Sequence, residues 1–387
     1  MNLTKKLISF FKTKKIWNLP KKTSILIFDN AGSQLLSKYF NNYSFSILDT
    51  RWESINMQIL LKSFIKNSNY FDSYINFVSP QILITFIDNN PSFYLKKVKH
   101  PKIVTIFIQN GVRSYIGDIF ETLLFAKKNL NFHVDYMLCF NETVAKKYKQ
   151  YIAGESIIIG SFKNNMAPIK NNFDLKTKTL IFISQYRKPE KLNSILFYNC
   201  GQPIYWNDFF SSEMKLLPLL FEYCQRKKIN FAICGCSIEN VSDEIKFYNK
   251  ILGTNKWQYK SKSSEFSSYQ IIDESNFVIT IDSTLGIEAL TRNKRVAFFS
   301  CRPKSIGYDD SDILWPNNYC KSGSFWTSEI SKEEFERVMN FTIEESDLNW
   351  NKRKDNIQNL IMTYDHQNKK FQNLIESILN NNIYVKQ

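Results

Sequence analysis

Short apolar runs rich in β-branched residues recur along the chain, and each of them ends in a small or polar residue. In the first half, the predicted strands are residues 23–29, 44–49, 81–88, 102–111, 134–141 and 155–161. Segments with apolar side chains at helical spacing, such as 54–67 and 117–129, lie between them. Strands that alternate with helices form a parallel sheet that is covered by helices on both faces. The alternation therefore predicts an α/β domain in the first half.

The same alternation restarts after a polar stretch at residues 163–178, which predicts a linker between two domains. The predicted strands of the second half are residues 179–184, 230–235, 277–282 and 295–300. Its predicted helices are residues 212–228, 243–252 and 285–292. The length of 387 residues also favours two domains over one. We expect an N-terminal domain at 1–165, a C-terminal domain at 178–330 and a polar helical tail at 331–387.

The net charge of +15 suits three kinds of partner, namely nucleic acid, an anionic membrane surface or a phosphorylated substrate. Apart from the lysines within the first 22 residues, this charge is not gathered in one arm or stripe. The sequence has no RNA-binding aromatic signature and no zinc-finger spacing. We therefore expect no nucleic acid partner, and a basic nucleic-acid-binding protein is the non-enzyme alternative.

The sequence offers little support for a metal or a cofactor. Its cysteines have no repeated spacing, and His100, His133 and His366 form no cluster with acidic residues. Asp310 and Asp312 match the D-x-D pattern of metal-dependent transferases, but they lie in a loop-like stretch. The absence of a dinucleotide-binding glycine motif and of a P-loop argues against a dehydrogenase or a kinase. We expect neither a metal nor a cofactor.

One strand runs directly into a turn of small hydroxyl residues and then into a helix, over the segment ITIDSTLGIEA. The amide groups and the positive end of such a helix bind phosphate well, and Ser283 and Thr284 add hydroxyl groups. Glu288, one turn further along, is placed to reach a ribose hydroxyl. Ordinary capping of the helix by Asp282 or its neighbours is the alternative. Ligands of open α/β sheets bind at the carboxyl ends of strands, which favours the phosphate site.

A second group of candidate donor-binding residues follows the first strand after the linker, at Ser184, Gln185, Tyr186 and Arg187. Arg187 can hold a phosphate in a bidentate manner, and Tyr186 offers a flat face for a base or a sugar. A solvated loop is the alternative. Gly235 ends the next strand, where the absence of a side chain lets a ligand approach the backbone.

A third group of polar residues closes the strands of the N-terminal half. The candidates on this acceptor side are Asp29, Asp88, Asn89, Gln109, Asn110, Gly111 and Arg113. The carboxyl ends of parallel strands meet at one edge of a sheet, so these residues are expected to lie together. A plain turn at Asn110 and Gly111 is the alternative.

Several of these segments resemble a family of bacterial glycosyltransferases for surface carbohydrate biosynthesis. The segments are ITFIDNN, IQNGVR, FISQYR, IDSTLGIEAL, VAFFS and GSFWT, which span most of the chain. The resemblance implies a GT-B fold of two facing Rossmann-like domains, with a nucleotide-activated sugar donor bound mainly by the C-terminal domain. The chain is similar, more distantly, to CMP-sugar transferases of capsule assembly and to polyol-phosphate transferases of teichoic acid synthesis. Those proteins often carry a His-Gly pair where this chain has Asn110-Gly111.

The expected reaction is a metal-independent transfer from a CMP- or UDP-linked sugar to a saccharide or lipid-linked acceptor. The helix after Asp282 would neutralise the charge that grows on the leaving phosphate. Asp88 would take a proton from the acceptor hydroxyl, Gln109 and Arg113 would orient it, and Asp29 is the reserve base. A polyol-phosphate transferase and a UDP-sugar epimerase on the same fold are the alternatives.

The first residues of the chain are basic and amphipathic. Leu3, Leu7, Phe10, Phe11 and Trp17 recur at roughly helical spacing among lysines. Such a helix can lie on an anionic inner-membrane surface, and a frayed or core-docked helix is the alternative. No apolar run reaches the ~20 residues that span a bilayer, and no cleavage site follows the start. We therefore expect a cytoplasmic protein that is peripheral at the inner membrane.

Overall fold

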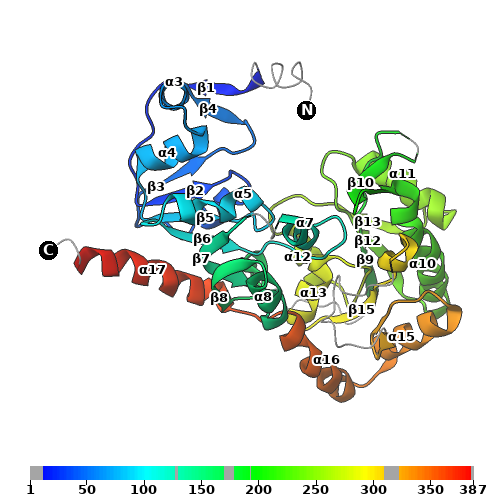
Figure 1. Ribbon diagram of the computed structural model, residues 1–387. Coiled ribbons are helices and arrows are strands. Elements are labelled where there is room, and N and C mark those ends of the chain that lie inside the picture. Colours follow the sequence, from blue (N-terminus) through cyan, green and yellow to red (C-terminus); the bar gives the residue numbers. More distant parts are fainter. Residues whose placement is uncertain (1–11, 127–129, 170–177, 192, 309–321, 385–387) are drawn as a thin grey trace. The chain divides into compact units, whose positions relative to one another are not determined.

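The computed structural model describes residues 12–126, 130–169, 178–191, 193–308 and 322–384 (Figure 1). The chain divides into two compact units. Unit 1 contains Met1–Asn110, Thr122–Lys163 and Asp365–Gln387, whereas unit 2 contains Gly111–Glu121 and Asn164–Tyr364. This division differs from the expected boundaries at two places. The segment Gly111–Glu121 belongs to unit 2, and the C-terminal helices are shared between the units.

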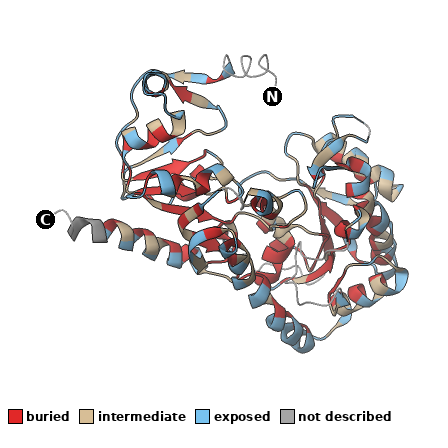
Figure 2. Cartoon of the chain, viewed as in Figure 1, coloured by how far each residue is buried: buried red, intermediate tan, exposed pale blue. Residues whose placement is uncertain are grey.

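Unit 1 is built on six parallel strands in the order β3-β2-β5-β6-β7-β8. These strands are β2 (Ile25–Phe28), β3 (Phe45–Leu48), β5 (Ile82–Thr85), β6 (Val104–Ile108), β7 (Phe132–Cys139) and β8 (Ile152–Ile158). A separate parallel pair joins β1 (Lys14–Ile16) to β4 (Ser54–Asn56). Residues 25–28 and 82–85 are buried along their whole length, because the sheet is covered on both faces (Figure 2).

The helices of unit 1 alternate with its strands along the chain. They are α2 (Ser33–Ser37), α3 (Met57–Ile65), α4 (Tyr70–Val78), α5 (Pro91–Tyr94), α6 (Lys96–Lys99), α8 (Glu142–Lys149) and α17 (Lys369–Tyr384). Two further helices, α7 (Ile119–Ala126) and α9 (Phe162–Met166), lie where the chain passes between the units. Phe371 of α17 packs against the rings of Tyr39, Phe40 and Phe162, so the last helix completes the core of unit 1.

Unit 2 is built on a seven-stranded sheet in the order β13-β12-β9-β14-β15-β17-β16, in which only β16 is antiparallel to its neighbour. These strands are β9 (Thr179–Ile183), β12 (Asn230–Cys234), β13 (Gln258–Lys260), β14 (Phe277–Thr280), β15 (Arg295–Phe299), β16 (Ser322–Gly323) and β17 (Trp326–Thr327). A separate hairpin joins β10 (Ile195–Asn199) to β11 (Gln202–Tyr205).

Helices cover both faces of the unit 2 sheet. They are α10 (Trp206–Lys227), α11 (Val241–Leu252), α12 (Ser267–Asp273), α13 (Thr284–Thr291), α14 (Arg302–Ser305), α15 (Lys332–Glu344) and α16 (Asp347–Ile361), and a 3₁₀ turn, η1 (His366–Asn368), follows in unit 1. Along β9, Leu180 and Phe182 join a cluster with α10 and α15. Ile181 points to the opposite face and packs with Ile271 of α12 and Leu285 of α13. Successive side chains of the strand point to opposite faces of the sheet, and both faces are buried.

Each sheet reverses its direction of growth beside its first strand. In unit 1, β2 lies between β3 and β5, and in unit 2, β9 lies between β12 and β14. In open α/β sheets, ligands bind beyond the carboxyl ends of the strands at such a switch point. The segments that follow β2 and β5, and those that follow β9 and β14, are therefore the places to look for a site.

The helix expected at the start of the chain needs correction. Lys14–Ile16 form a strand and not the end of a helix, because their backbone pairs with β4. The segment 54–67, expected to be wholly helical, begins with this strand β4. Leu3, Leu7, Phe10 and Phe11 lie outside the described residues. The expected helical C-terminal region is present, with α15 and α16 in unit 2 and α17 in unit 1. None of the described helices is both long enough and apolar enough to cross a bilayer.

Candidate functional site

The switch point of unit 2 brings together two of the predicted donor-binding segments. Strands β9 and β14 are parallel neighbours, with Ile279 opposite Phe182. Residues 184–187, which follow β9, and residues 281–283, which follow β14, therefore leave the sheet at the same edge. Residues 282–285 are half-buried, so the first turn of α13 remains accessible to solvent.

The start of α13 is held by hydroxyl groups of its own unit. Ser283 is the N-cap, and its Oγ accepts a hydrogen bond from the Leu285 amide at 3.3 Å. The Ser283 amide donates to Thr280 Oγ1 at 3.1 Å. A Cβ atom built at Gly286 would lie 2.4 Å from Thr280 Cγ2, so a glycine is required for α13 to lie this close to β14. The ordinary helix cap, which was the alternative to a phosphate site, is present. It leaves the helix terminus facing solvent.

The segment that follows β6 packs on this helix terminus within unit 2. The Val112 amide donates to Thr284 Oγ1 at 3.0 Å. A Cβ atom built at Gly111 would lie 3.4 Å from Arg113 Nη1 and 3.7 Å from Thr284 Oγ1. The guanidinium of Arg113 and the hydroxyl of Thr284 thus border the same side-chain-free position. Gly111 and Arg113 were expected on the acceptor side, but the structure places both with the predicted donor residues.

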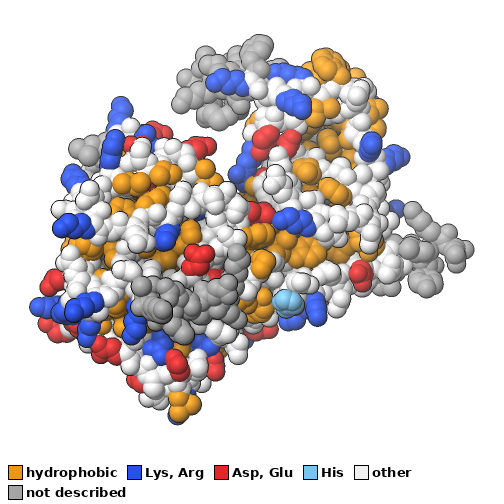
Figure 3. Space-filling view, turned by 180° about the vertical axis from the view of Figure 1, so that it is seen from behind, with side chains coloured by type: hydrophobic (Ala, Val, Ile, Leu, Met, Phe, Trp, Pro, Cys, Tyr) orange, Lys and Arg blue, Asp and Glu red, His pale blue; other side chains and the backbone are white. Residues whose placement is uncertain are grey.

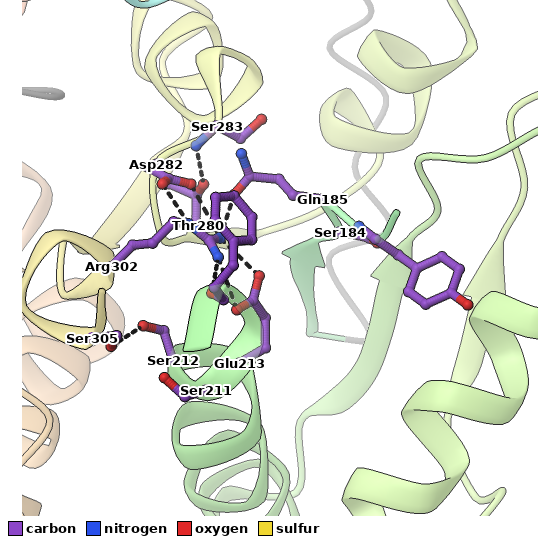
Figure 4. Close-up of polar contacts among 12 residues, drawn as sticks. Ser184, Gln185, Ser211, Ser212, Glu213, Thr280, Asp282, Ser283, Arg302 and Ser305 are labelled. Atoms are coloured by element: carbon purple, nitrogen blue, oxygen red, sulfur yellow. Dashed lines mark hydrogen bonds and ion pairs between the residues drawn. The ribbon is translucent and has the colours of Figure 1, made fainter. Parts of the chain in front are cut away.

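Asp282 is part of a largely buried ion network with Arg302 and Glu213, which Figure 4 shows. Arg302, the first residue of α14, donates from Nε to Asp282 Oδ2 at 2.6 Å and from Nη2 to Glu213 Oε1 at 2.8 Å. Its Nη2 also donates to Gln185 Oε1 at 3.1 Å. The guanidinium stacks 3.9 Å above the ring of Phe209. Arg302 therefore joins the segments after β9, β14 and β15 to α10.

The charge of Arg302 and those of Glu213 and Asp282 stabilise one another. Arg302 is 1% exposed and Glu213 is 0% exposed, so neither is stabilised by solvent. Burial raises the pKa of the Glu213 carboxyl above its ordinary value, and the charge of Arg302 opposes that shift. Burial alone would lower the pKa of Arg302, but the charges of Asp282 and Glu213 raise it above its ordinary value. Asp282 thus holds Arg302 in place, and its carboxylate is engaged within the protein.

A second buried carboxylate organises the segments that follow β9 and β12. Glu244 of α11 accepts hydrogen bonds from the Cys236 and Ser237 amides, both at 3.1 Å, and from the Ser184 hydroxyl. Tyr259 also donates its hydroxyl to Glu244, at 2.7 Å. A Cβ atom built at Gly235 would lie 2.1 Å from that hydroxyl oxygen. Ser184 and Gly235 therefore have structural roles here that the sequence analysis had not considered.

The three remaining donor candidates differ in exposure. Tyr186 is 7% exposed and packs among Trp206, Phe210 and Phe247, so it does not offer the open face that the sequence predicted. Burial also raises the pKa of its hydroxyl. Arg187 is exposed, with its guanidinium 5.6 Å from the centre of the Phe209 ring. Glu288 is 6% exposed within α13.

In unit 1, the predicted base Asp88 is fully buried. Its Oδ1 accepts from the Asn110 amide at 3.2 Å, and its Oδ2 accepts from the Tyr148 hydroxyl at 2.6 Å. Tyr94 donates its hydroxyl to the Asp88 carbonyl. Through these bonds, Asp88 connects the ends of β5 and β6 to α8. Its role as a base stays a prediction.

The other acceptor-side candidates are also engaged in unit 1. Asp29 is 2% exposed and accepts from the Ala31 amide at 2.8 Å, from Thr50 Oγ1 at 2.6 Å and from Arg51 Nε at 3.0 Å. Gln109 is 1% exposed and accepts from the Phe140 amide at 2.8 Å. Of the group, Asn89 is exposed and Asn110 is half-buried.

Sequence reasoning missed Arg302, Glu213 and Glu244. Glu213 carried a usable signal, because it lies four residues after Phe209 and four before Leu217, on the apolar face of a helix, where a carboxylate must be paired. Arg302 follows a buried strand, as the candidate site residues do. Among the described residues, no group of three His, Cys, Asp or Glu side chains could hold a metal ion. Asp310 and Asp312 lie outside the described residues.

Solved structures of similar fold cover nearly the whole chain. One is the wall teichoic acid polymerase TagF in its H444N variant, with 11% identity, a TM-score of 0.54 and coverage of 94% of this chain and 90% of that one. Another is a putative UDP-N-acetylglucosamine 2-epimerase from Listeria monocytogenes, with 11% identity, a TM-score of 0.53 and coverage of 94% and 98%. A third is S. aureus MnaA with UDP, with 13% identity, a TM-score of 0.53 and coverage of 95% and 97%.

These similarities confirm the predicted GT-B fold class, with parallel sheets and a helical C-terminal region. No curated protein sequence matches the chain. A family model described as "putative O-antigen biosynthesis protein" matches residues 106–379, which is well over half of the chain. The predicted relation to surface carbohydrate biosynthesis is thereby confirmed, and the chain belongs to this O-antigen biosynthesis protein family.

Proposed function

We propose that the chain is a glycosyltransferase that takes a sugar from a nucleotide-activated donor. The observation that carries this proposal is the position of Gly111 at the accessible start of α13, where a Cβ atom would lie 3.4 Å from Arg113 Nη1 and 3.7 Å from Thr284 Oγ1. A helix N-terminus beside a guanidinium attracts a phosphate through its amide groups, its dipole and the positive charge, which Arg113 shares with Asp118 at 3.8 Å. The site also lies at the switch point of the unit 2 sheet.

The same arrangement suits the chemistry of the transfer. As the glycosidic bond breaks, negative charge grows on the leaving phosphate, and fixed amide groups and Arg113 lower the energy of that charge. This revises the earlier assignment of Arg113 from the acceptor to the donor. Solved structures of the same fold include one with UDP and another with UDP-GlcNAc, which supports a nucleotide-linked donor. The membership in an O-antigen biosynthesis family supports a saccharide or lipid-linked acceptor.

The test of the phosphate site is a nucleotide screen against CMP, CDP, UDP, GDP and TDP. We expect one of them to raise the thermal midpoint, and the double variant Ser283→Ala/Thr284→Ala to weaken its affinity by about tenfold through lost hydroxyl and cap contacts. Ser331→Ala is the matched control, because Ser331 caps α15 by accepting from the Glu334 amide at 3.1 Å. The control should lose about 1 kcal/mol of stability and no affinity. Equal affinity in the double variant and the wild type would remove this phosphate site.

A second experiment separates the transferase from a UDP-sugar epimerase of the same fold. Donor is incubated with and without membranes that carry lipid-linked saccharide, and the sugar is followed by NMR. A transferase releases nucleotide only with the acceptor, whereas an epimerase interconverts the donor sugar alone. Transfer of a polyol phosphate would instead leave CMP and a new phosphodiester. We also propose that the protein works at the anionic surface where such an acceptor is held.

A further inference from the structure

Helix α3 of unit 1 presents an apolar face to solvent. Its inner face packs through Ile59 and Ser63, which are buried, while Leu61, Phe64 and Ile65 are 55%, 73% and 84% exposed. An isolated exposed leucine is ordinary on a protein surface, but neighbouring large apolar side chains on one helix are not. Figure 3 shows hydrophobic side chains beside Lys or Arg side chains at the end of unit 1 that carries α3.

The segment of β1 extends this face. Gln58 at the start of α3 donates from Nε2 to the Trp17 carbonyl at 2.6 Å, and β1 pairs with β4, which leads directly into α3. Trp17 is 63% exposed, and Ile16 and Leu19 beside it are 37% and 39% exposed. We call these residues, with Leu61, Phe64 and Ile65, the α3 face.

The charges on the two segments that form the α3 face are all of one sign, and the exposed Glu53 lies next to them, beside Lys14. Residues 12–22 and 57–66 contain seven lysines and no acidic residue. The exposed ones include Lys14, Lys62 and Lys66. Each lysine near an anionic lipid surface contributes about 1 kcal/mol to binding at low salt. The charge on this part of unit 1 is therefore complementary to an anionic bilayer.

The combination distinguishes a lipid surface from a protein partner. The buried centre of a protein–protein interface is depleted of lysine and of charge in general. Peripheral membrane segments instead combine apolar and aromatic side chains with surrounding lysines, whose long stems reach the headgroups. We propose that the α3 face inserts Trp17, Phe64 and Ile65 among the headgroups of an anionic bilayer. This inference locates the membrane contact proposed above, and it does not depend on which group the enzyme transfers.

The experiment is flotation of the full chain with vesicles of phosphatidylglycerol and phosphatidylethanolamine, or of phosphatidylcholine alone. The wild type should float with the anionic vesicles and be released as salt is raised. Phe64→Gln/Ile65→Gln should lower the partition coefficient by about tenfold or more, because two apolar side chains no longer enter the lipid. Lys62→Gln/Lys66→Gln should bind less at low salt and show a weaker salt dependence.

Leu348→Gln is the matched control, because Leu348 of α16 is 81% exposed in unit 2 beside Asp347. It should bind as the wild type does. Removal of residues 1–11 tests the rival anchor that the sequence suggested, and vesicle binding should largely survive it. The proposal is overturned if Phe64→Gln/Ile65→Gln floats normally, or if the truncation alone abolishes flotation. It is also overturned if the wild type is a dimer in solution that this double variant separates. Nucleotide affinity should be the same in all these variants, which keeps the outcome independent of the donor site.

Discussion

Both units are built on an open, mainly parallel sheet with a switch point, but they use the ends of their strands differently. In unit 1, the carboxylates of Asp29 and Asp88 are buried and accept hydrogen bonds from neighbouring amide and hydroxyl groups. In unit 2, Asp282 is likewise engaged, through Arg302, but the helix that follows it begins at half-buried residues. We call the unit 1 edge closed because its carboxylates are buried and paired within the unit, although Asn30 and Asn89 there are exposed. The unit 2 edge instead leaves the N-terminus of an eight-residue helix accessible.

This difference shows what an acidic residue after a buried strand does in this chain. Each of the three aspartates accepts a hydrogen bond within its own unit: Asp29 from Ala31 just after its own strand, Asp88 from Asn110 after β6, and Asp282 from Arg302 of α14. A ligand at unit 2 would instead meet amide groups, Arg113 and hydroxyl oxygens. In the proposed donor site, binding therefore depends on these groups and not on the carboxylates.

The largest expected effect comes from the buried charges of unit 2. Arg302→Met leaves Glu213 and Asp282 without their counter-charge, and should lower the free energy of unfolding by about 3–5 kcal/mol in chemical denaturation. Arg51→Met is the matching change in unit 1, since Arg51 pairs with Asp29 but has a side chain that is 56% exposed. It should cost less than about 1 kcal/mol.

A further substitution tests whether charge is the cause. Glu213→Gln in the Arg302→Met background removes one uncompensated carboxylate and should recover part of the lost stability. Equal losses for Arg302→Met and Arg51→Met would contradict the distinction between a buried network in unit 2 and a solvent-exposed pair in unit 1.

The next effect concerns how closely α13 approaches the sheet. Gly286→Ala places a methyl group 2.4 Å from Thr280 Cγ2, and should cost about 1–3 kcal/mol despite the better helix propensity of alanine. Nucleotide affinity should fall as well, because the shifted helix moves the amide groups of the phosphate site. Thr280→Ser removes Cγ2 but keeps the hydroxyl that accepts from the Ser283 amide. Adding Thr280→Ser to Gly286→Ala should restore part of the lost stability and part of the lost nucleotide affinity. An unchanged thermal unfolding midpoint for Gly286→Ala would show that α13 is not held tightly against β14.

The strands and the fold class were predictable from the sequence because a period of two and buried β-branched runs are local signals. Every strand predicted in the central sheets is present, with ends shifted by a few residues, such as 102–111 against Val104–Ile108. The strand β1 was not predictable, because Lys14–Ile16 become extended only by pairing with β4, about 40 residues away. Local periodicity at residues 12–17 indicates a helix equally well.

The site was predictable in part for the same reason. Ser283, Thr284 and Gln185 follow strands directly, so topology alone brings them to one edge. The packing of Gly111–Glu121 within unit 2 was not predictable, because this segment follows a strand of unit 1 and its Val112 amide donates to Thr284, 172 residues further along the chain. The pairing of Arg302 with Glu213 likewise joins residues 89 positions apart. Such long-range partners depend on tertiary packing that no local pattern contains.

The smallest expected effect tests the closed edge of unit 1. Asp88→Asn replaces one acceptor oxygen with a donor, and Tyr148→Phe removes the hydroxyl that donates to the same carboxylate. Each should lower the free energy of unfolding by about 1–2 kcal/mol, because a buried polar group loses a partner. If Asp88 only positions the Asn110 segment, both variants should keep donor affinity and lose turnover by similar factors below about tenfold.

The base role predicted for Asp88 has a different signature. A general base contributes about 10²–10⁴-fold, so its amide variant should lose turnover by at least that lower factor while binding donor normally. Tyr148→Phe would keep the carboxylate and most of the turnover. We expect the two variants to behave alike, because Asp88 is fully buried and both of its oxygens accept bonds from unit 1. A loss confined to Asp88→Asn would mean that the unit 1 edge opens during the reaction. The contrast between a closed and an accessible edge would then hold only for the unliganded protein.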